Sequence, residues 1–84
     1  MKIIFSENSW EEYLSWISDD KKVLKKINEL ITDITHNPYQ GKGKPEPLKY
    51  QLSGYWSRRI TLEHRLVYQV LDNELFIISC RYHY

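Results

Sequence analysis

The stretch LFIISCRYHY, residues 75–84, decides how we interpret the fold of this chain. Apolar, β-branched and aromatic residues dominate it, as is typical of a central β-strand. We therefore predict a strand that continues to the end of the chain. Its last four residues are an arginine, two tyrosines and a histidine, which can bind ligands or transfer protons. Because chain ends usually fray unless something holds them, a core strand that ends in such residues indicates a functional site.

Length and composition limit the class of protein. The 84 residues suit one small domain, which we expect to span residues 1–84. The single cysteine, Cys80, excludes an intramolecular disulfide and disfavours a Cys/His zinc site. The apolar run at the N-terminus is too short for a signal peptide or a membrane span. We therefore expect a cytoplasmic protein with no membrane partner.

Charge is unevenly distributed, although the formal net charge is only +1. The segment up to Asp20 is mainly acidic, whereas lysines and arginines outnumber acidic residues from Gly41 onward. The C-terminal half is therefore expected to contact an anionic partner.

The first half of the chain predicts a short strand and two helices. Residues 2–5 form a short apolar run, and a helix follows that is capped by Ser6 or by Ser9. In the second case Ser9 and Glu12 would form a capping box. The expected apolar face of this helix consists of Trp10, Tyr13, Leu14 and Ile17. A second helix, ending at Asn37-Pro38, has a continuous apolar stripe formed by Val23, Leu24, Ile27, Leu30, Ile31 and Ile34.

The second half of the chain predicts an antiparallel sheet. Strand signals cover residues 48–52, 55–62, 65–71 and 75–83. Gly54, Glu63-His64 and Asp72-Asn73 mark the turns between these strands. The whole pattern predicts an α+β fold, in which a short N-terminal strand precedes two helices packed on one face of a curved, mainly antiparallel sheet.

Alternation along the strands predicts which residues face away from the helices. We expect the even-numbered positions to form the core, with Arg58 as a misfit among Trp56, Ile60, Leu66, Tyr68, Val70, Phe76, Ile78 and Cys80. The opposite face would be polar and cationic, and would carry Arg59, Arg65, Arg81 and His83. A solvated surface explains any one of these arginines, but together they favour an anion, because arginine binds phosphate through two parallel hydrogen bonds.

Two titratable residues could convert such binding into catalysis. Glu46 lies between two prolines at the entry to the sheet, and His83 lies at its exit. Each alone is more simply explained as a surface or packing residue. Cleavage of RNA by its own 2′-hydroxyl requires a base, a cation beside the phosphate and an acid for the leaving 5′ oxygen. Glu46, the arginines and His83 would supply these groups without a metal ion or cofactor, and no metal-binding motif is recognisable in the sequence.

Further residues could contribute to RNA binding. Tyr84 is a candidate for stacking on unpaired bases. The Gly-Lys-Gly-Lys stretch has neither the preceding strand nor the following helix of a nucleotide-binding loop. We therefore interpret Lys42, Lys44 and Lys49 only as contacts to the phosphate backbone.

Five blocks of sequence carry a resemblance to a known family. They are KKINELI (25–31), GKGKPEPLK (41–49), LSGYWSRRI (52–60), EHRLVY (63–68) and CRYHY (80–84). Together they resemble the YoeB branch of the RelE superfamily, which comprises ribosome-dependent mRNA interferase toxins of bacterial toxin–antitoxin modules. This resemblance implies a microbial-ribonuclease-like fold.

The resemblance also implies roles for individual residues. Glu46 would be the general base and His83 the general acid, while Arg65 would stabilise the pentavalent phosphate. Lys49 and Arg59 would hold the RNA backbone. Tyr84 would help to position the substrate.

The resemblance implies partners as well. The protein would cleave mRNA in the A site of the 70S ribosome and so inhibit translation. A cognate, YefM-like antitoxin would neutralise it by folding a disordered C-terminal segment over it, and toxins of this branch can form homodimers. Two alternatives remain open from the sequence: a non-catalytic RNA-binding module, and a domain whose basic face binds an acidic protein.

Overall fold

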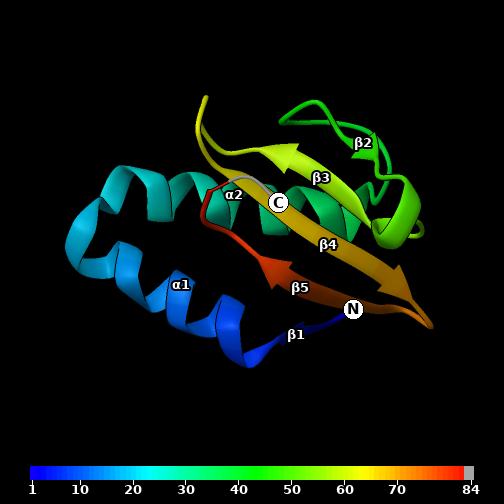
Figure 1. Ribbon diagram of the computed structural model, residues 1–84, viewed down its shortest axis with the longest axis horizontal. Coiled ribbons are helices and arrows are strands. Elements are labelled where there is room, and N and C mark those ends of the chain that lie inside the picture. Colours follow the sequence, from blue (N-terminus) through cyan, green and yellow to red (C-terminus); the bar gives the residue numbers. More distant parts are fainter. Residues whose placement is uncertain (83–84) are drawn as a thin grey trace.

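The computed structural model describes residues 1–82, and His83 and Tyr84 lie outside the described residues. Two helices, α1 (Glu7–Asp19) and α2 (Lys21–His36), lie against one face of a five-stranded sheet (Figure 1). The strands, in the order β1-β5-β4-β3-β2, are β1 (Lys2–Phe5), β5 (Glu74–Ser79), β4 (Arg65–Leu71), β3 (Trp56–Arg59) and β2 (Glu46–Pro47). Strand β1 runs parallel to β5 and the other pairs are antiparallel, so the predicted α+β class is confirmed.

Helix α2 follows the sequence prediction closely. Its N-cap Asp20 accepts hydrogen bonds from the backbone N–H groups of Lys22 and Val23, at 3.0 and 3.4 Å. Five of the six residues in the predicted stripe are buried, and Leu24 is half-buried. This stripe joins one core cluster with the side chains of β4 and β5, so burial of apolar surface holds α2 on the sheet.

Helix α1 contradicts its predicted apolar face. Trp10, Leu14 and Ile17 are exposed, whereas Ser9 and Trp16 are buried. The reason lies in the backbone of the last strand and of the residue that follows it. Ser9 Oγ donates to the Ile77 carbonyl at 2.7 Å, and Trp16 Nε1 donates to the Cys80 carbonyl at 3.0 Å. The orientation of α1 therefore satisfies these polar groups. The exposed Trp10 ring stacks on the ring of Tyr13.

The cap of α1 also decides between the two sequence alternatives. The helix begins at Glu7, and the Ser6 hydroxyl accepts a hydrogen bond from the Ser9 backbone N–H at 3.1 Å. Ser6 is therefore the N-cap, and the predicted capping box of Ser9 and Glu12 is wrong. Glu12 instead accepts a hydrogen bond from the Cys80 backbone N–H at 2.8 Å.

Strand β5 reverses the predicted alternation. Leu75 and Ile77 are fully buried, whereas Phe76 and Ile78 are half-buried. A register shift opposite Val67 and Tyr68 then adds one residue to β5, which returns Cys80 to the core. The strand ends at Ser79, so the prediction of a strand reaching the end of the chain is wrong.

Two other strand predictions require correction and one turn is confirmed. Residues 48–52 are not a strand, because a 3-10 turn covers Tyr50–Leu52. The strand predicted over residues 55–62 is shorter, Trp56–Arg59. The hairpin at Asp72-Asn73 is present, with φ values of 52° and 60° that suit a two-residue type I′ turn. No helix within residues 1–82 is long and apolar enough to cross a membrane.

Candidate functional site on the open face of the sheet

The sheet face turned away from the helices, here called the open face, carries three of the predicted site residues. Glu46 pairs with Ser57 of β3, and Arg59 pairs with Arg65 of β4. Because Arg58 between Ser57 and Arg59 points into the core, its two neighbours point toward the open face. Three adjacent strands therefore bring the candidate base Glu46 and two arginines to one surface.

Arg59 and Arg65 are directly opposite each other, which is unfavourable for two like charges. The Arg65 Nη1 atom donates to the carbonyl oxygens of Thr61, Leu62 and His64, at 3.0, 3.4 and 3.3 Å. The Arg65 guanidinium makes no other hydrogen bond to residues 1–82, so its remaining N–H groups can bind an anion. An anionic ligand would relieve the repulsion between the two guanidinium groups.

The turn after β2 forms a pocket of about 520 Å³ beside the candidate base. Glu46 and Lys49 both line it, and both side chains are exposed. Leu48 is nearly buried and its N–H donates to the Tyr55 carbonyl at 2.9 Å, which closes the turn against β3. A carboxylate and an ammonium group thus line one solvent-accessible hollow.

The loop before β2 carries Lys42 and Lys44, and both side chains are exposed. The Gly43 carbonyl accepts a hydrogen bond from the Arg59 N–H at 2.7 Å, which ties this loop to β3. A Cβ atom at Gly43, where φ is 79°, would lie 2.9 Å from Leu30 Cδ2. Close packing therefore explains this glycine without a nucleotide-binding loop.

Arg58, the misfit of the predicted core face, is fully buried and holds this loop in place. It donates five hydrogen bonds, to the Asp33 carboxylate, the Tyr68 hydroxyl and the backbone carbonyls of Asn37, Gln40 and Lys42. The contact with Asp33 Oδ2 is 2.5 Å long and joins α2 to β3. We call Arg58, Asp33 and Tyr68 the arginine cluster.

Charge and burial within the arginine cluster shift two pKa values. Hydrogen bonds from Arg58 and from the Lys42 N–H lower the pKa of Asp33. Burial raises the pKa of Tyr68, whose hydroxyl donates to the Pro38 carbonyl at 2.6 Å. Both shifts keep the charges that the cluster needs: an ionised Asp33 beside Arg58 and a neutral tyrosine in the core.

Arg81 does not lie on the open face, so its predicted grouping with Arg59 and Arg65 is wrong. Its Nη1 atom donates to Ser15 Oγ at 2.5 Å and to Asp19 Oδ2 at 2.8 Å, and its guanidinium lies 4.1 Å from the centre of the Trp16 ring. The hydrogen bond with Asp19 raises the pKa of Arg81. Strand β5 ends at Ser79, so the contacts with α1, and not the alternation of a strand, decide where the Arg81 side chain lies.

The segment Cys80–Tyr82, here called the C-terminal segment, is fixed beside Arg65. The Tyr82 N–H donates to His64 Nδ1 at 2.7 Å, and the Arg65 N–H donates to the Tyr82 carbonyl at 3.2 Å. Burial raises the pKa of the Cys80 thiol to about 12, so this thiol is not a nucleophile. The roles predicted for His83 and Tyr84 lie outside the described residues and stay predictions.

His64 is a residue that the sequence analysis missed, because it was assigned only to a turn. Its ring also packs edge-on against Trp16, with the ring centres 4.8 Å apart. A signal was available in hindsight: the sequence block EHRLVY places His64 next to Arg65. Nothing in that block, however, indicated that its partner would be the backbone of Tyr82.

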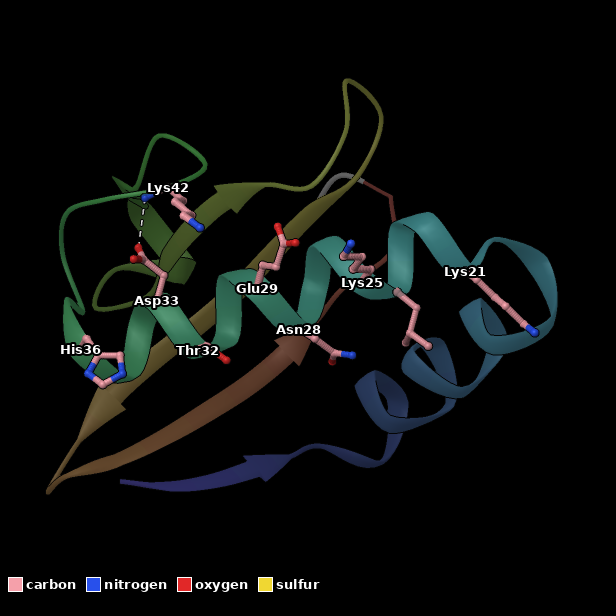
Figure 2. A pocket seen from close by; sticks show the side chains of 9 residues that line it. Lys21, Lys25, Asn28, Glu29, Thr32, Asp33, His36 and Lys42 are labelled. Carbon is pink, nitrogen blue, oxygen red and sulfur yellow. Dashed lines mark hydrogen bonds between the residues drawn. The ribbon is translucent and has the colours of Figure 1, made fainter.

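A second pocket, of about 500 Å³, lies along the outer face of α2 (Figure 2). Of the predicted site residues it includes Lys42, whose N–H donates to Asp33 Oδ2 at 3.0 Å, as the dashed line in Figure 2 shows. Its lining consists of Lys21, Leu24, Lys25, Asn28, Glu29, Thr32, Asp33, His36 and Lys42. Glu46, Arg59 and Arg65 are not among them, so this pocket is separate from the open face.

Comparison with known proteins points to one family. The family model described as "YoeB-like toxin of bacterial type II toxin-antitoxin system" matches residues 5–84. The chain is 64% identical to the toxin YoeB of Escherichia coli strain K12 over 84 residues, which cover 100% of both chains.

Solved structures agree with the sequence match. The YoeB/ParE toxin from Agrobacterium tumefaciens superposes with a TM-score of 0.98 at 48% identity, over 100% of both chains. YoeB from Staphylococcus aureus, solved in a heterotetrameric YoeB–YefM complex, superposes with a TM-score of 0.93 at 53% identity, over 100% of this chain and 98% of that one. The YoeB dimer from the same organism gives the same values.

Proposed function

The chain belongs to the YoeB-like toxins of bacterial type II toxin–antitoxin systems, and on that premise we propose that it is a ribosome-dependent endoribonuclease. Its substrate would be mRNA in the A site of the 70S ribosome, and cleavage would inhibit translation. The observation that carries the proposal is the shared position of Glu46, Arg59 and Arg65 on the open face. Residues 1–84 would act as one toxin domain in the cytoplasm.

In the proposed reaction the RNA supplies its own nucleophile. The Glu46 carboxylate takes the proton of a 2′-hydroxyl, and that oxygen attacks the adjacent phosphorus. The bond from phosphorus to the 5′ oxygen breaks, and His83 gives that oxygen a proton. The products are a 2′,3′-cyclic phosphate and a 5′-hydroxyl. Each proton transfer contributes roughly 10²–10⁴-fold to the rate.

The cations have separate roles in this reaction. Arg65 stabilises the charge that develops on the pentavalent phosphate, which contributes about 10²–10³-fold. Arg59 and Lys49 hold the RNA backbone, with Lys42 and Lys44 as further phosphate contacts. Tyr84 helps to position the substrate. Arg81 is excluded from this set because Ser15 and Asp19 already bind it.

The test is a map of cleavage positions on a translated message, made by primer extension with and without ribosomes. Wild-type protein is expected to cut only when ribosomes are present. Glu46→Gln and His83→Gln should each lower the rate by at least about 100-fold while ribosome binding persists. Glu11→Gln, which removes an exposed carboxylate on α1, is the matched control and should cut normally. Normal cleavage by both site variants would refute the acid and base roles.

We also propose that a YefM-like antitoxin binds and neutralises this toxin, and that the free toxin forms a homodimer. The support is the family membership together with the complex and the dimer described for the Staphylococcus aureus protein. Light scattering of the purified chain, alone and with a YefM antitoxin, would measure both assemblies. A monomer at all concentrations would contradict the dimer.

A further inference from the structure

Tyr50 is an aromatic residue that the structure exposes without giving it a structural role. The residue is 87% exposed, compared with 51% for Tyr39, whose ring centre lies 4.9 Å from that of Trp56. Among residues 1–82, no aromatic ring packs against Tyr50, and its hydroxyl makes no hydrogen bond. Packing in the fold therefore does not explain why a large aromatic ring occupies this position.

The backbone of Tyr50 is also unfavourable for a tyrosine. Its φ angle is 58°, in the left-handed region that residues with a Cβ atom seldom adopt. The turn is closed by backbone hydrogen bonds from Leu52 N–H to the Lys49 carbonyl at 3.1 Å and from Ser53 N–H to the Tyr50 carbonyl at 3.0 Å. Glycine would satisfy this backbone better, and strained residues of this kind cluster at functional sites.

The surroundings of Tyr50 suggest what the ring contacts. It lines the pocket of about 520 Å³ together with Glu46 and Lys49, and it directly follows Lys49 in the chain. With Lys49 on the RNA backbone and Glu46 as the base, as proposed above, the Tyr50 ring adjoins the nucleotides next to the reacting phosphate. Tyrosine suits such a contact, because it offers a large rigid surface with only two side-chain torsions to immobilise.

We propose that the Tyr50 ring is a stacking site for an unpaired nucleobase next to the cleaved phosphate. The proposal rests on the proposed function, since it assumes an RNA strand on the open face. Stacking tolerates every base, so Tyr50 would contribute affinity and position without selecting a sequence. The strained turn presents the ring to solvent and keeps it away from the protein core.

Substitutions at Tyr50 separate the effect of its aromatic ring from the effect of its strained backbone. Tyr50→Ala should lower single-turnover cleavage on ribosomes about tenfold, which is within the usual contribution of one stacked base. Tyr50→Gly relieves the backbone and should show the same loss, whereas Tyr50→Phe and Tyr50→Trp should cut like wild type. Ile17→Ala removes an exposed apolar side chain on α1, on the other side of the molecule from β2 (Figure 1), and should have no effect. Thermal unfolding of each variant confirms that it folds.

A second measurement detects stacking without cleavage. The message carries 2-aminopurine beside the cleavage position, and the protein carries Glu46→Gln so that the RNA stays intact. Binding should quench the fluorescence, and adding Tyr50→Ala should remove the quenching. If the wild-type protein does not cut at all, the proposed function fails, but this measurement still decides the stacking site. Three outcomes would overturn the proposal. They are quenching that Tyr50→Ala leaves unchanged, normal cleavage by Tyr50→Ala, and a cleavage rate that Tyr50→Phe lowers as much as Tyr50→Ala does.

Discussion

Two segments flank the open face, and the structure holds them in different ways. The loop before β2, which leads to Glu46, depends on one buried guanidinium that binds three of its backbone carbonyls. The C-terminal segment instead has several independent contacts, to Glu12, Ser15, Trp16 and Asp19 of α1 and to His64. We therefore expect that substitution of Arg58 alone disorders the whole loop before β2. Substitution of any one contact residue should loosen the C-terminal segment only partly.

The largest expected effect tests the first half of this comparison. Arg58→Met removes the buried charge that pairs with Asp33 and leaves the carbonyl groups of Asn37, Gln40 and Lys42 without this donor. We expect a loss of about 3–5 kcal/mol in the free energy of unfolding, measured by urea titration. Arg59→Met, the exposed neighbour, should change it by less than about 0.5 kcal/mol. Equal effects of the two substitutions would mean that the arginine cluster does not hold the loop.

A smaller effect is expected from the other member of the ion pair. Because the pKa of Asp33 is lowered in the folded state, its contribution to stability is complete above its unfolded pKa and is lost as the pH falls through the lower folded value. Asp33→Asn should cost about 2 kcal/mol at neutral pH, the range for hydrogen bonds to charged groups. Urea titrations at several pH values should show this difference shrinking in acid.

The control for Asp33 is an aspartate that has no ion-pair partner among the described residues 1–82. Asp72 lies exposed in the β4–β5 turn, and asparagine tolerates its left-handed backbone. Asp72→Asn should leave the free energy of unfolding at neutral pH close to wild type. If Asp33→Asn lowered the free energy of unfolding by the same amount at every pH, the carboxylate would act through its shape and not through its charge.

The smallest effect is expected in the C-terminal segment. His64→Ala removes one of several contacts, the acceptor of the Tyr82 N–H, and should cost about 1 kcal/mol. Its clearest sign should be faster hydrogen exchange at the Tyr82 amide, measured by NMR. His64→Asn places an oxygen near the position of Nδ1 and should restore part of the protection. Exchange that is unchanged by His64→Ala would show that the remaining contacts suffice.

The parts of the fold that were predictable depend on short-range regularity. Helix α2 packs one stripe against one partner, so its 3.6-residue period identified the buried residues. The alternation in β3 and β4 likewise placed Arg59 and Arg65 on one face, because the register between these strands is regular. Both cases need only the periodicity of a single element and no knowledge of distant residues.

The failures occur where residues far apart in the chain decide the outcome. The bulge in β5 depends on its pairing with another strand, β4. The α1 residues that bind Arg81 lie more than sixty positions away from it in the chain. Arg58 was recognised as out of pattern, but its acceptors lie on α2 and on the loop that follows it. No local pattern indicates which carbonyls a buried arginine will bind.

The parallel pairing of β1 with β5 has a consequence for biosynthesis. Strand β1 has no neighbouring strand, and the Ser9 and Trp16 side chains of α1 lack their carbonyl acceptors, until β5 and Cys80 have been translated and have left the exit tunnel. Contacts so distant in sequence also form slowly, because a long loop must close before they stabilise anything. A nascent chain of this toxin is therefore expected to stay without its native tertiary structure, and hence inert, on the ribosome that is making it.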